Sequence, residues 1–362
     1  MRAIPALSLA AALLMTAALT NAPGSALADT LDQKLRAGFK NGELPGLHGA
    51  VIDLGKRRLA EIYFPGKDER WGSPIGERQH GPDTLHDLRS VTKSVVGLLY
   101  GIALAEGKVP APSEPLYAQF PDYPDLMAEP GRDRILVAHA LSMQMGLEWN
   151  EDLPYSDPRN SEIGMERASD RYRYVLEQPI REAPGQSWIY SGGAVALLGR
   201  LIEIGTGMSL DAYARHTLFE PLGISHFEWV RGADGTPSAA SGLRLTLPDL
   251  AKIGHLVAQD GRYDGKQVVP KAWIEESVTP RADVTEGTRY GYLWYIAGRP
   301  KAPLAIAVGN GGQRLTVQPE HDFVVAAFVG RYNDPLSWQT SLKVTLDYAA
   351  PAAKALLSRQ QP

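Results

Sequence analysis

The chain contains no cysteine among its 362 residues. That absence excludes a disulfide-stabilised scaffold, a thiolate nucleophile, an iron–sulfur cluster and any zinc site built on cysteine. The chain also lacks a dominant basic block, and its 37 Lys and Arg residues against 41 Asp and Glu residues leave a net charge of −4. Since proteins that bind nucleic acids generally show a basic face, we expect no nucleic-acid partner.

Several signatures of known chemistry are missing as well. The sequence has no Gly-x-Ser-x-Gly elbow, no His-Glu-x-x-His, no P-loop and no Gly-x-Gly-x-x-Gly. Its eight histidines show no spacing typical of metal ligands. His86 precedes Ser90 by four residues, so it either lies near a site at Ser90 or, as we expect, belongs to a loop.

Long apolar runs are missing except near the N-terminus. Arg2 is the only charged residue before Asp29, an apolar run covers 7–19, and Ala26-Leu27-Ala28 fits the small-x-small cleavage rule. The run is shorter than the ~20 residues that span a membrane, which disfavours the alternative of an anchor. We therefore expect residues 1–28 to be a signal peptide cut after Ala28, and a periplasmic or secreted mature chain without a membrane span.

The composition that is present is typical of a folded globular protein, with 44% hydrophobic and 22% charged residues. Apolar patterns predict an N-terminal hairpin and, near the C-terminus, three further strands. A polar stretch rich in Gly and Pro follows the hairpin and is expected to be irregular. The hairpin strands are 50–54 and 59–64, the polar stretch is 65–83, and the later strands are 304–308, 315–317 and 323–329.

Helical patterns fill the middle of the chain and both flanks. This order predicts an α+β fold in which strands from both ends share one antiparallel sheet, flanked by helices, with a mainly helical lobe inserted. We expect one domain over 29–362, with a sheet lobe at 29–85 and 285–362 and a helical lobe at 86–284. The predicted helices are 31–39, 90–106, 137–145, 194–204, 210–218, 248–259 and 337–357.

Ser90 and Lys93 are three residues apart at the start of the predicted helix 90–106, so they share one face of it. A serine hydroxyl is a poor nucleophile until a base removes its proton. A lysine can be that base when it is neutral, which burial and the positive end of a helix favour. The same helix end offers the Ser90 N–H to an oxyanion. The alternative is an N-capping serine with a solvated lysine.

Two glycines follow inside the same predicted helix. Gly97 and Gly101 are four residues apart, and each lowers the intrinsic stability of a helix. Their presence indicates that another element packs closely against that face.

Two further segments carry candidate groups. Tyr190 lies in a tight turn before helix 194–204, where its hydroxyl can take the Ser90 proton if the Lys93 charge lowers its pKa. The alternative is a core tyrosine. The segment Gly-Asn-Gly-Gly-Gln at 309–313 lies between two predicted strands, and the N–H of Gln313 is a candidate second oxyanion donor. The alternative is a plain hairpin turn.

In order, Ser90-x-x-Lys93, Tyr190-Ser191-Gly192 and Asn310-Gly311-Gly312 resemble the three motifs of the penicillin-recognising serine hydrolases. That superfamily includes class C β-lactamases, D-alanyl-D-alanine peptidases, esterases and 6-aminohexanoate-dimer hydrolases. The segments 141–149, 241–252 and 290–295 resemble others of the family, so the resemblance covers roughly 45–330.

The resemblance implies a β-lactamase/transpeptidase-like fold and a set of roles. Ser90 would be the acylated nucleophile, Lys93 its proton partner and Tyr190 the base. The backbone N–H groups of Ser90 and Gln313 would form the oxyanion hole. This chemistry needs neither a metal nor an organic cofactor.

Two departures from the family pattern bear on the substrate. Gly192 stands where Asn is usual, and Asn310 stands where Lys is usual, which removes an amide and a cation that hold a peptide or penicillin. A lost polar partner commonly costs ~1–3 kcal/mol. Arg314 is a candidate to replace part of the charge. The motifs look most like those of the 6-aminohexanoate-dimer hydrolase and esterase branch.

We therefore expect a small-molecule ester or linear amide as substrate. The alternatives are β-lactamase or D-Ala-D-Ala peptidase activity, or a penicillin-sensor-like module without turnover. The segment 150–160 is either a lid or an exposed loop. Candidates for the substrate-binding wall, with core positions as the alternative for the aromatic ones, are Gly192, Asn310, Gly311, Gly312, Trp149, Tyr155, Trp188 and Trp294.

Overall fold

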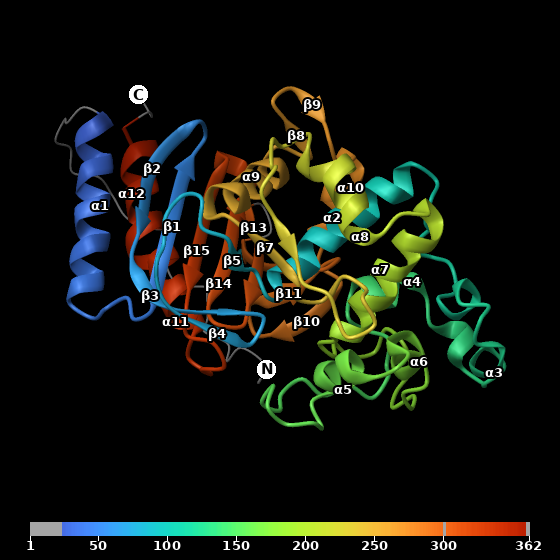
Figure 1. The fold of residues 1–362 in the computed structure, drawn as a ribbon. Coiled ribbons are helices and arrows are strands. Elements are labelled where there is room, and N and C mark those ends of the chain that lie inside the picture. Colours follow the sequence, from blue (N-terminus) through green and yellow to red (C-terminus); the bar gives the residue numbers. More distant parts are fainter. Residues whose placement is uncertain (1–23, 300–301, 360–362) are drawn as a thin grey trace.

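An eight-stranded antiparallel sheet forms the centre of the computed structural model, which describes residues 24–299 and 302–359 (Figure 1). The N-terminal hairpin continues the sheet that the C-terminal strands begin, because β1 pairs with β2 on one side and β15 on the other. This confirms the predicted α+β fold with one sheet built from both ends. The strand order is β10 (Ala282–Thr285), β11 (Thr288–Tyr290), β12 (Tyr295–Arg299), β13 (Ala302–Gly309), β14 (Gln313–Gln318), β15 (Phe323–Val329), β1 (Leu47–Leu54) and β2 (Arg57–Tyr63).

Helices cover both faces of this sheet, so its central strands are apolar on both sides. Along β15, Val324 and Ala326 belong to one hydrophobic cluster while Val325 belongs to the other, as the twofold repeat of a strand requires. One face packs against α1 (Gly24–Lys40) and the C-terminal helical run α11 (Trp338–Lys343), a π-helical segment (Val344–Ala349) and α12 (Ala350–Leu357). The other face packs against α2 (Val91–Ala105) and α9 (Leu247–Ala258).

The remaining helices gather beyond α2 on the side of the sheet away from α1 (Figure 1). Helix α7 (Gly192–Thr206) is central there, because it packs against α2 and four shorter helices. The four helices that pack on α7 are α4 (Val137–Leu141), α5 (Ser161–Arg167), α6 (Arg171–Leu176) and α8 (Leu210–Ala214), which continues in a π-helical segment (Arg215–Phe219). The region also contains α3 (Pro124–Met127) and α10 (Lys271–Ser277). Short 3₁₀ turns are Tyr117–Gln119, Arg132–Arg134 and Pro319–His321.

Three small sheets complete the fold. The first is the hairpin β3–β4, which extends over the nucleophile side of the main sheet. The second, in the order β5-β7-β6, leads directly into Ser90. Their bounds are β3 (Pro65–Arg70), β4 (Ser73–Gln79), β5 (His86–Asp87), β6 (Glu228–Trp229), β7 (Leu243–Leu245), β8 (Arg262–Tyr263) and β9 (Lys266–Gln267).

Three local predictions were wrong. The stretch 65–83 is largely the hairpin β3–β4, whose mostly exposed polar residues give no apolar alternation to detect. The helix predicted over 137–145 ends at Leu141, because Met143 takes a left-handed φ of 61°. His86 is not in a loop: it lies in strand β5 and is fully buried.

The prediction of a close neighbour at the two glycines of α2 is confirmed. A Cβ added at Gly101 would lie 1.9 Å from the ring of Trp273 in α10, and one at Gly97 would lie 3.3 Å from Leu293. The Trp273 indole also donates a hydrogen bond to the Gly97 carbonyl over 2.8 Å. Glycine at these positions lets α10 and the segment before β12 approach the backbone of α2.

The N-terminal predictions fall mainly outside the described residues, which begin at residue 24. The predicted cut after Ala28 lies within α1, and the signal peptide stays a prediction. In the described part of the chain, no helix has by itself the length and apolar character to cross a membrane, although the bent pair Gly192–Thr206 and Leu210–Phe219 would pass together by those criteria.

Candidate active site

Ser90 is the N-cap residue of α2, and Lys93 follows one turn later on the same face. The Lys93 ammonium donates to Ser90 Oγ over 3.1 Å and to the Ala240 carbonyl over 2.9 Å. The lysine side chain is only 1% exposed. The structure therefore excludes the solvated lysine that was the alternative to a catalytic pair.

The backbone immediately before the serine is strained. Arg89 has a φ of 50°, in the left-handed region that non-glycine residues seldom occupy. Its guanidinium holds this conformation through ion pairs with Glu69 at 3.2 Å and Asp87 at 3.1 Å. Strain that neighbouring contacts maintain in this way is common at functional sites, and here it sets the direction of the Ser90 side chain.

Tyr190 reaches the same serine from the turn before α7. Ser90 and the Tyr190 phenol are hydrogen-bonded, and Lys93 Nζ lies 4.9 Å from the centre of the phenol ring. Lys93 from α2 and Tyr190 from the turn before α7 thus meet at the Ser90 hydroxyl. The pKa of Tyr190 is raised well above its usual value, first by burial and then by the neighbouring Glu151. The condition that Lys93 lowers this pKa is therefore not met, because desolvation dominates.

A buried pair of carboxyl groups that no sequence motif indicates lies beside Lys93. Glu151 accepts hydrogen bonds from the Trp149 indole at 2.6 Å and the Gly192 N–H at 2.5 Å. Glu162 accepts one from Ser241 Oγ at 2.9 Å and is hydrogen-bonded to Glu151. Burial raises the pKa of Glu151, whereas Lys93 lowers that of Glu162 against the effect of burial. These opposite shifts favour a single shared proton on Glu151 and a negative charge on Glu162.

Gly192 makes room for this pair. A Cβ at position 192 would lie 3.1 Å from Glu151 Oε1 and 3.2 Å from the carboxyl carbon of Glu162. The space that an Asn side chain would need is thus taken by the two carboxyl groups. No local signal in the sequence could show this, because Glu151 and Glu162 lie in a loop and a short helix about 30–40 residues before the glycine.

The Gly-rich segment at the end of β13 closes the site from the sheet. A Cβ at Gly309 would lie 2.4 Å from the Leu88 carbonyl, so this strand end lies against the segment that leads to Ser90. Gly311 and Gly312 have φ values of 102° and 101° and turn the chain into Gln313. The structure therefore brings the two predicted oxyanion donors, Ser90 and Gln313, to neighbouring segments.

Two side chains of this segment have distinct surroundings. The Asn310 amide donates to Asn333 Oδ1 over 2.8 Å, and the Asn333 N–H donates to Asn310 Oδ1 over 2.8 Å. Gln313 is fully buried, and neither polar atom of its side chain has a hydrogen-bond partner in the described residues. Because two hydrogen bonds join its side chain to Asn333, Asn310 is a neutral, fixed group at the mouth of the site.

Two adjoining cavities open at these residues. The first, of about 490 Å³, is lined by Ser90, Arg89, Trp71, Glu162 and Asn310 among others. The second, of about 720 Å³, is lined by Gly309, Asn310, Gly312, Gln313 and the segment 151–155. Tyr155 borders both and donates to Glu162 over 3.3 Å. The loop 150–160 thus forms a wall shared by the two cavities.

The other predicted wall residues lie further away. Trp294 is 1% exposed and packed in the core, and Trp149 packs on Gly193, so neither lines these two cavities. Trp188 is half-buried against the ring of Tyr190. Arg314 is buried, donates weakly to Ser341 Oγ at 3.4 Å and also lines neither cavity, so the structure does not bring its charge to the cleft.

The profile of the Beta-lactamase family matches residues 20–346. The chain belongs to this family, has its β-lactamase-like fold, and is a serine hydrolase. It is 25% identical over 298 residues to the 6-aminohexanoate-dimer hydrolase of Paenarthrobacter ureafaciens, covering 76% of this chain and 70% of that one.

Two further relatives widen the comparison. The beta-lactamase of Escherichia coli K12 is 28% identical over 222 residues, which is 60% of this chain and about half (52%) of that protein. The structure of EstCE1, described as a hydrolase with promiscuous acyltransferase activity, superposes with a TM-score of 0.70 at 16% identity, covering 91% of this chain and 98% of the other. The latter similarity shows a shared fold.

Proposed function

We propose that this protein cleaves small esters or linear amides through an acyl-enzyme on Ser90. The observation that carries the proposal is the meeting of Lys93 and Tyr190 at Ser90 Oγ, at the edge of a cavity. Two hydrogen-bonding groups on one serine hydroxyl provide the means to remove its proton and to return it. No metal or organic cofactor enters the scheme.

The raised pKa of Tyr190 shapes the first step. Because the phenol is protonated at rest, we propose that it acts as a relay: it accepts the Ser90 proton while its own proton passes to the leaving alcohol or amine. Lys93, held by Ala240 and faced by Glu162, stabilises the negative charge that develops on Ser90 Oγ. Ser90 Oγ adds to the carbonyl carbon, and the bond to the alcohol or amine then breaks to leave acyl-Ser90. Water next adds to the same carbonyl carbon and gives a proton to Tyr190, and the bond to Ser90 Oγ breaks, so that the carboxylic acid is released and Ser90 regains its proton.

The substrate class rests on what surrounds the serine. Asn310 is neutral and bonded to Asn333, while Gly192 offers no side-chain amide, so the mouth lacks the cation and amide that would hold a penicillin or a peptide terminus. The similarity to a 6-aminohexanoate-dimer hydrolase points in the same direction. A linear amide or ester fits a cleft formed by two adjoining cavities.

The test combines steady-state rates with intact mass at short reaction times. The substrates are a short-chain p-nitrophenyl ester, a linear 6-aminohexanoate dimer and a cephalosporin. The variants are Ser90→Ala and, as a matched control, Ser358→Ala on the last helical turn. We expect ester or amide turnover that Ser90→Ala abolishes and Ser358→Ala retains, with little cephalosporin hydrolysis.

Other outcomes would identify the alternatives. Faster turnover of the cephalosporin than of the ester or the dimer would indicate a β-lactamase. A lasting Ser90 adduct without turnover would indicate a penicillin-sensor-like protein. Full activity in Ser90→Ala would remove the proposed nucleophile.

We also propose that the protein is exported, on the strength of the pattern in residues 1–28. Expression of the full chain in a bacterium, followed by fractionation and intact mass, tests this. We expect a periplasmic or secreted chain that begins at Asp29. An uncut chain that stays in the cytoplasm would refute the proposal.

A further inference from the structure

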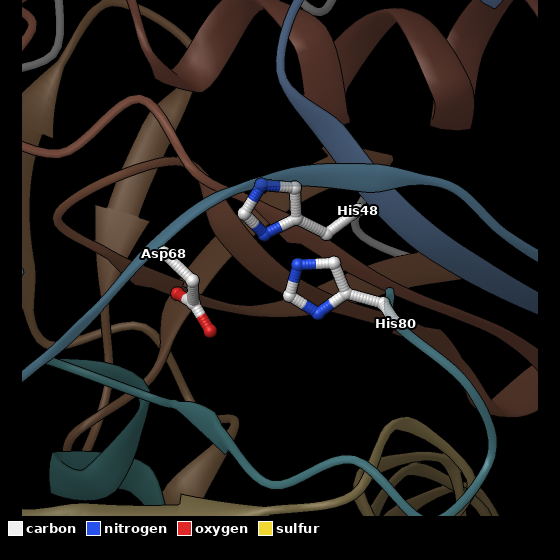
Figure 2. Close-up of side chains that lie close together, drawn as sticks. All are labelled: His48, Asp68 and His80. Carbon is white, nitrogen blue, oxygen red and sulfur yellow. The ribbon is translucent and has the colours of Figure 1, made fainter. Parts of the chain in front are cut away.

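A second cluster of reactive side chains lies where strand β1, the hairpin β3–β4 and strand β5 meet. It consists of His48 from β1, Asp68 from β3, His80 just after β4 and His86 from β5. Figure 2 shows the side chains of His48, Asp68 and His80 turned toward one another. One ligating atom from each of these three lies within 4.8 Å of the other two. The irregular pairing of β1 with β15 between Leu47 and Gly49 falls at His48.

Each histidine uses one ring nitrogen on the backbone. His86 Nδ1 donates to the Asp87 carbonyl over 3.0 Å, and the rings of His48 and His80 are hydrogen-bonded to the backbone of Lys67 and Gly66. Neutral imidazoles have one N–H each, so their second nitrogens face the cluster as lone pairs.

The inward atoms are poorly satisfied in the described chain, where His86 Nε2 is 3.6 Å from Asp68 Oδ1. His48 Nδ1 lies 2.9 Å from His86 Nε2, where two lone pairs would repel unless an electrophile joins them. His80 Nε2 and Asp68 Oδ2 are buried without any hydrogen-bond partner. Asp68 is 3% exposed, so its charge is also largely removed from water. Unpaired buried polar atoms are costly, and here several converge on one point.

We propose that His48, Asp68 and His80 bind one divalent transition-metal ion, zinc by preference, with His86 as the fourth ligand. Three imidazole nitrogens and one carboxylate form a donor set that suits tetrahedral zinc. Donor atoms of such a site are ~3.3 Å apart at the usual bond lengths, so the stacked rings of His48 and His80 would have to turn toward each other when the ion binds.

The surroundings have the features of a supported metal site. The non-ligating nitrogens of the histidines are held by backbone carbonyls, and Tyr332 donates to Asp68 Oδ1 over 2.9 Å; such bonds fix the orientation of metal ligands. Two glycines leave room for the rings, because a Cβ at Gly66 or Gly330 would lie 2.4 or 2.3 Å from His48 Nε2. His80 is only half-buried, which provides an entry path.

The ion would act on structure and not on the reaction. It would join β1, the hairpin β3–β4 and strand β5, which are distant in sequence. The tip of that hairpin borders the catalytic cleft, since the Trp71 N–H donates to Asp87 Oδ2 over 2.6 Å and its indole to Ser241 over 3.2 Å. The metal would therefore fix one wall of the cleft and the segment that carries Arg89 and Ser90.

The test measures metal content and metal response on the full-length protein. Wild type, His80→Asn, Asp68→Asn and the exposed control His226→Asn are purified from zinc-supplemented medium, and zinc is counted by mass spectrometry. After chelation, zinc and cobalt are titrated back while the melting temperature and the visible spectrum of cobalt are recorded.

We expect about one zinc per chain in wild type and in His226→Asn. The melting temperature should fall on chelation and return with zinc, and cobalt should give the visible bands of a four-coordinate site. Loss of one ligand in His80→Asn or Asp68→Asn should weaken zinc binding at least 10- to 100-fold. A wild-type chain that takes up neither metal, or a His80→Asn chain that binds zinc like wild type, overturns the proposal. If His80→Asn does not fold, the wild-type count and Asp68→Asn decide.

Discussion

The two members of the buried carboxyl pair should respond in opposite ways to the same substitution. Glu151 holds the shared proton, so Glu151→Gln replaces a neutral acid with a neutral amide of the same shape. The Gln oxygen can still accept from Trp149 and Gly192, and its NH₂ can donate to Glu162 as the acid proton does. We expect the free energy of unfolding to change by less than ~1 kcal/mol.

Glu162→Gln removes the negative charge that faces Lys93. The lysine is almost completely buried, and the hydroxyl of Ser90 and the carbonyl of Ala240 would be left as its hydrogen-bond partners. Removing one partner of a buried ion pair typically costs ~3–5 kcal/mol. We expect a loss of about 3 kcal/mol in stability, and a larger fall in ester turnover than Glu151→Gln causes.

Chemical denaturation with both variants measures these costs, and p-nitrophenyl ester hydrolysis measures activity. The pH dependence adds a second arm. A carboxyl group with a raised pKa in the folded state stabilises the fold least at high pH, so wild-type stability should fall as the pH rises above the usual Glu value of 4.5. Glu151→Gln should remove the part of that slope that Glu151 contributes between pH 4.5 and about 8, and leave the part that His255 contributes. Equal costs for the two variants, or a costly Glu151→Gln beside a benign Glu162→Gln, would refute the proposed proton assignment.

Three further outcomes can be checked. Gly192→Asn, which restores the usual family residue, should cost ~1–3 kcal/mol by crowding Glu151 and should not raise cephalosporin hydrolysis; a gain in hydrolysis rates would contradict this. Gly101→Val should lower the melting temperature sharply because its Cβ would overlap Trp273, whereas an unchanged melting curve would show that α10 can move away. His255 lies 2.9 Å from each of two aspartates, which raise its pKa to about 9. A raised histidine pKa stabilises the fold fully below pH 6.5, so about 3 kcal/mol of the free energy of unfolding should be lost between pH 6.5 and 9. His255→Gln should flatten this pH profile. A profile as steep as that of wild type would argue against the charged histidine.

The parts of the site that the sequence could predict are local in the chain. Ser90 and Lys93 share a helical face whatever the rest of the fold does, and the glycines of α2 indicate a close neighbour without naming it. The strand pattern at 323–329 matches β15 residue for residue, because a fully apolar run between polar turns has few other solutions. Tyr190 was a candidate for the same reason: a tight turn before an apolar helix fixes where its side chain starts.

The parts that the sequence could not predict depend on contacts between distant segments. Glu151 and Glu162 look like surface residues of a polar loop, and only the packing of that loop on Gly192 buries them beside Lys93. The same packing raises the pKa of Tyr190 through desolvation and the neighbouring Glu151, although a nearby lysine alone would favour a lower pKa. The four residues of the second cluster come from four separate segments, so their sequence spacing carries no metal signature even though their ligating atoms converge. In this chain, local sequence determines which residues stand at the nucleophile, and the tertiary fold determines which charges surround it; the substrate preference therefore depends on groups that no motif contains.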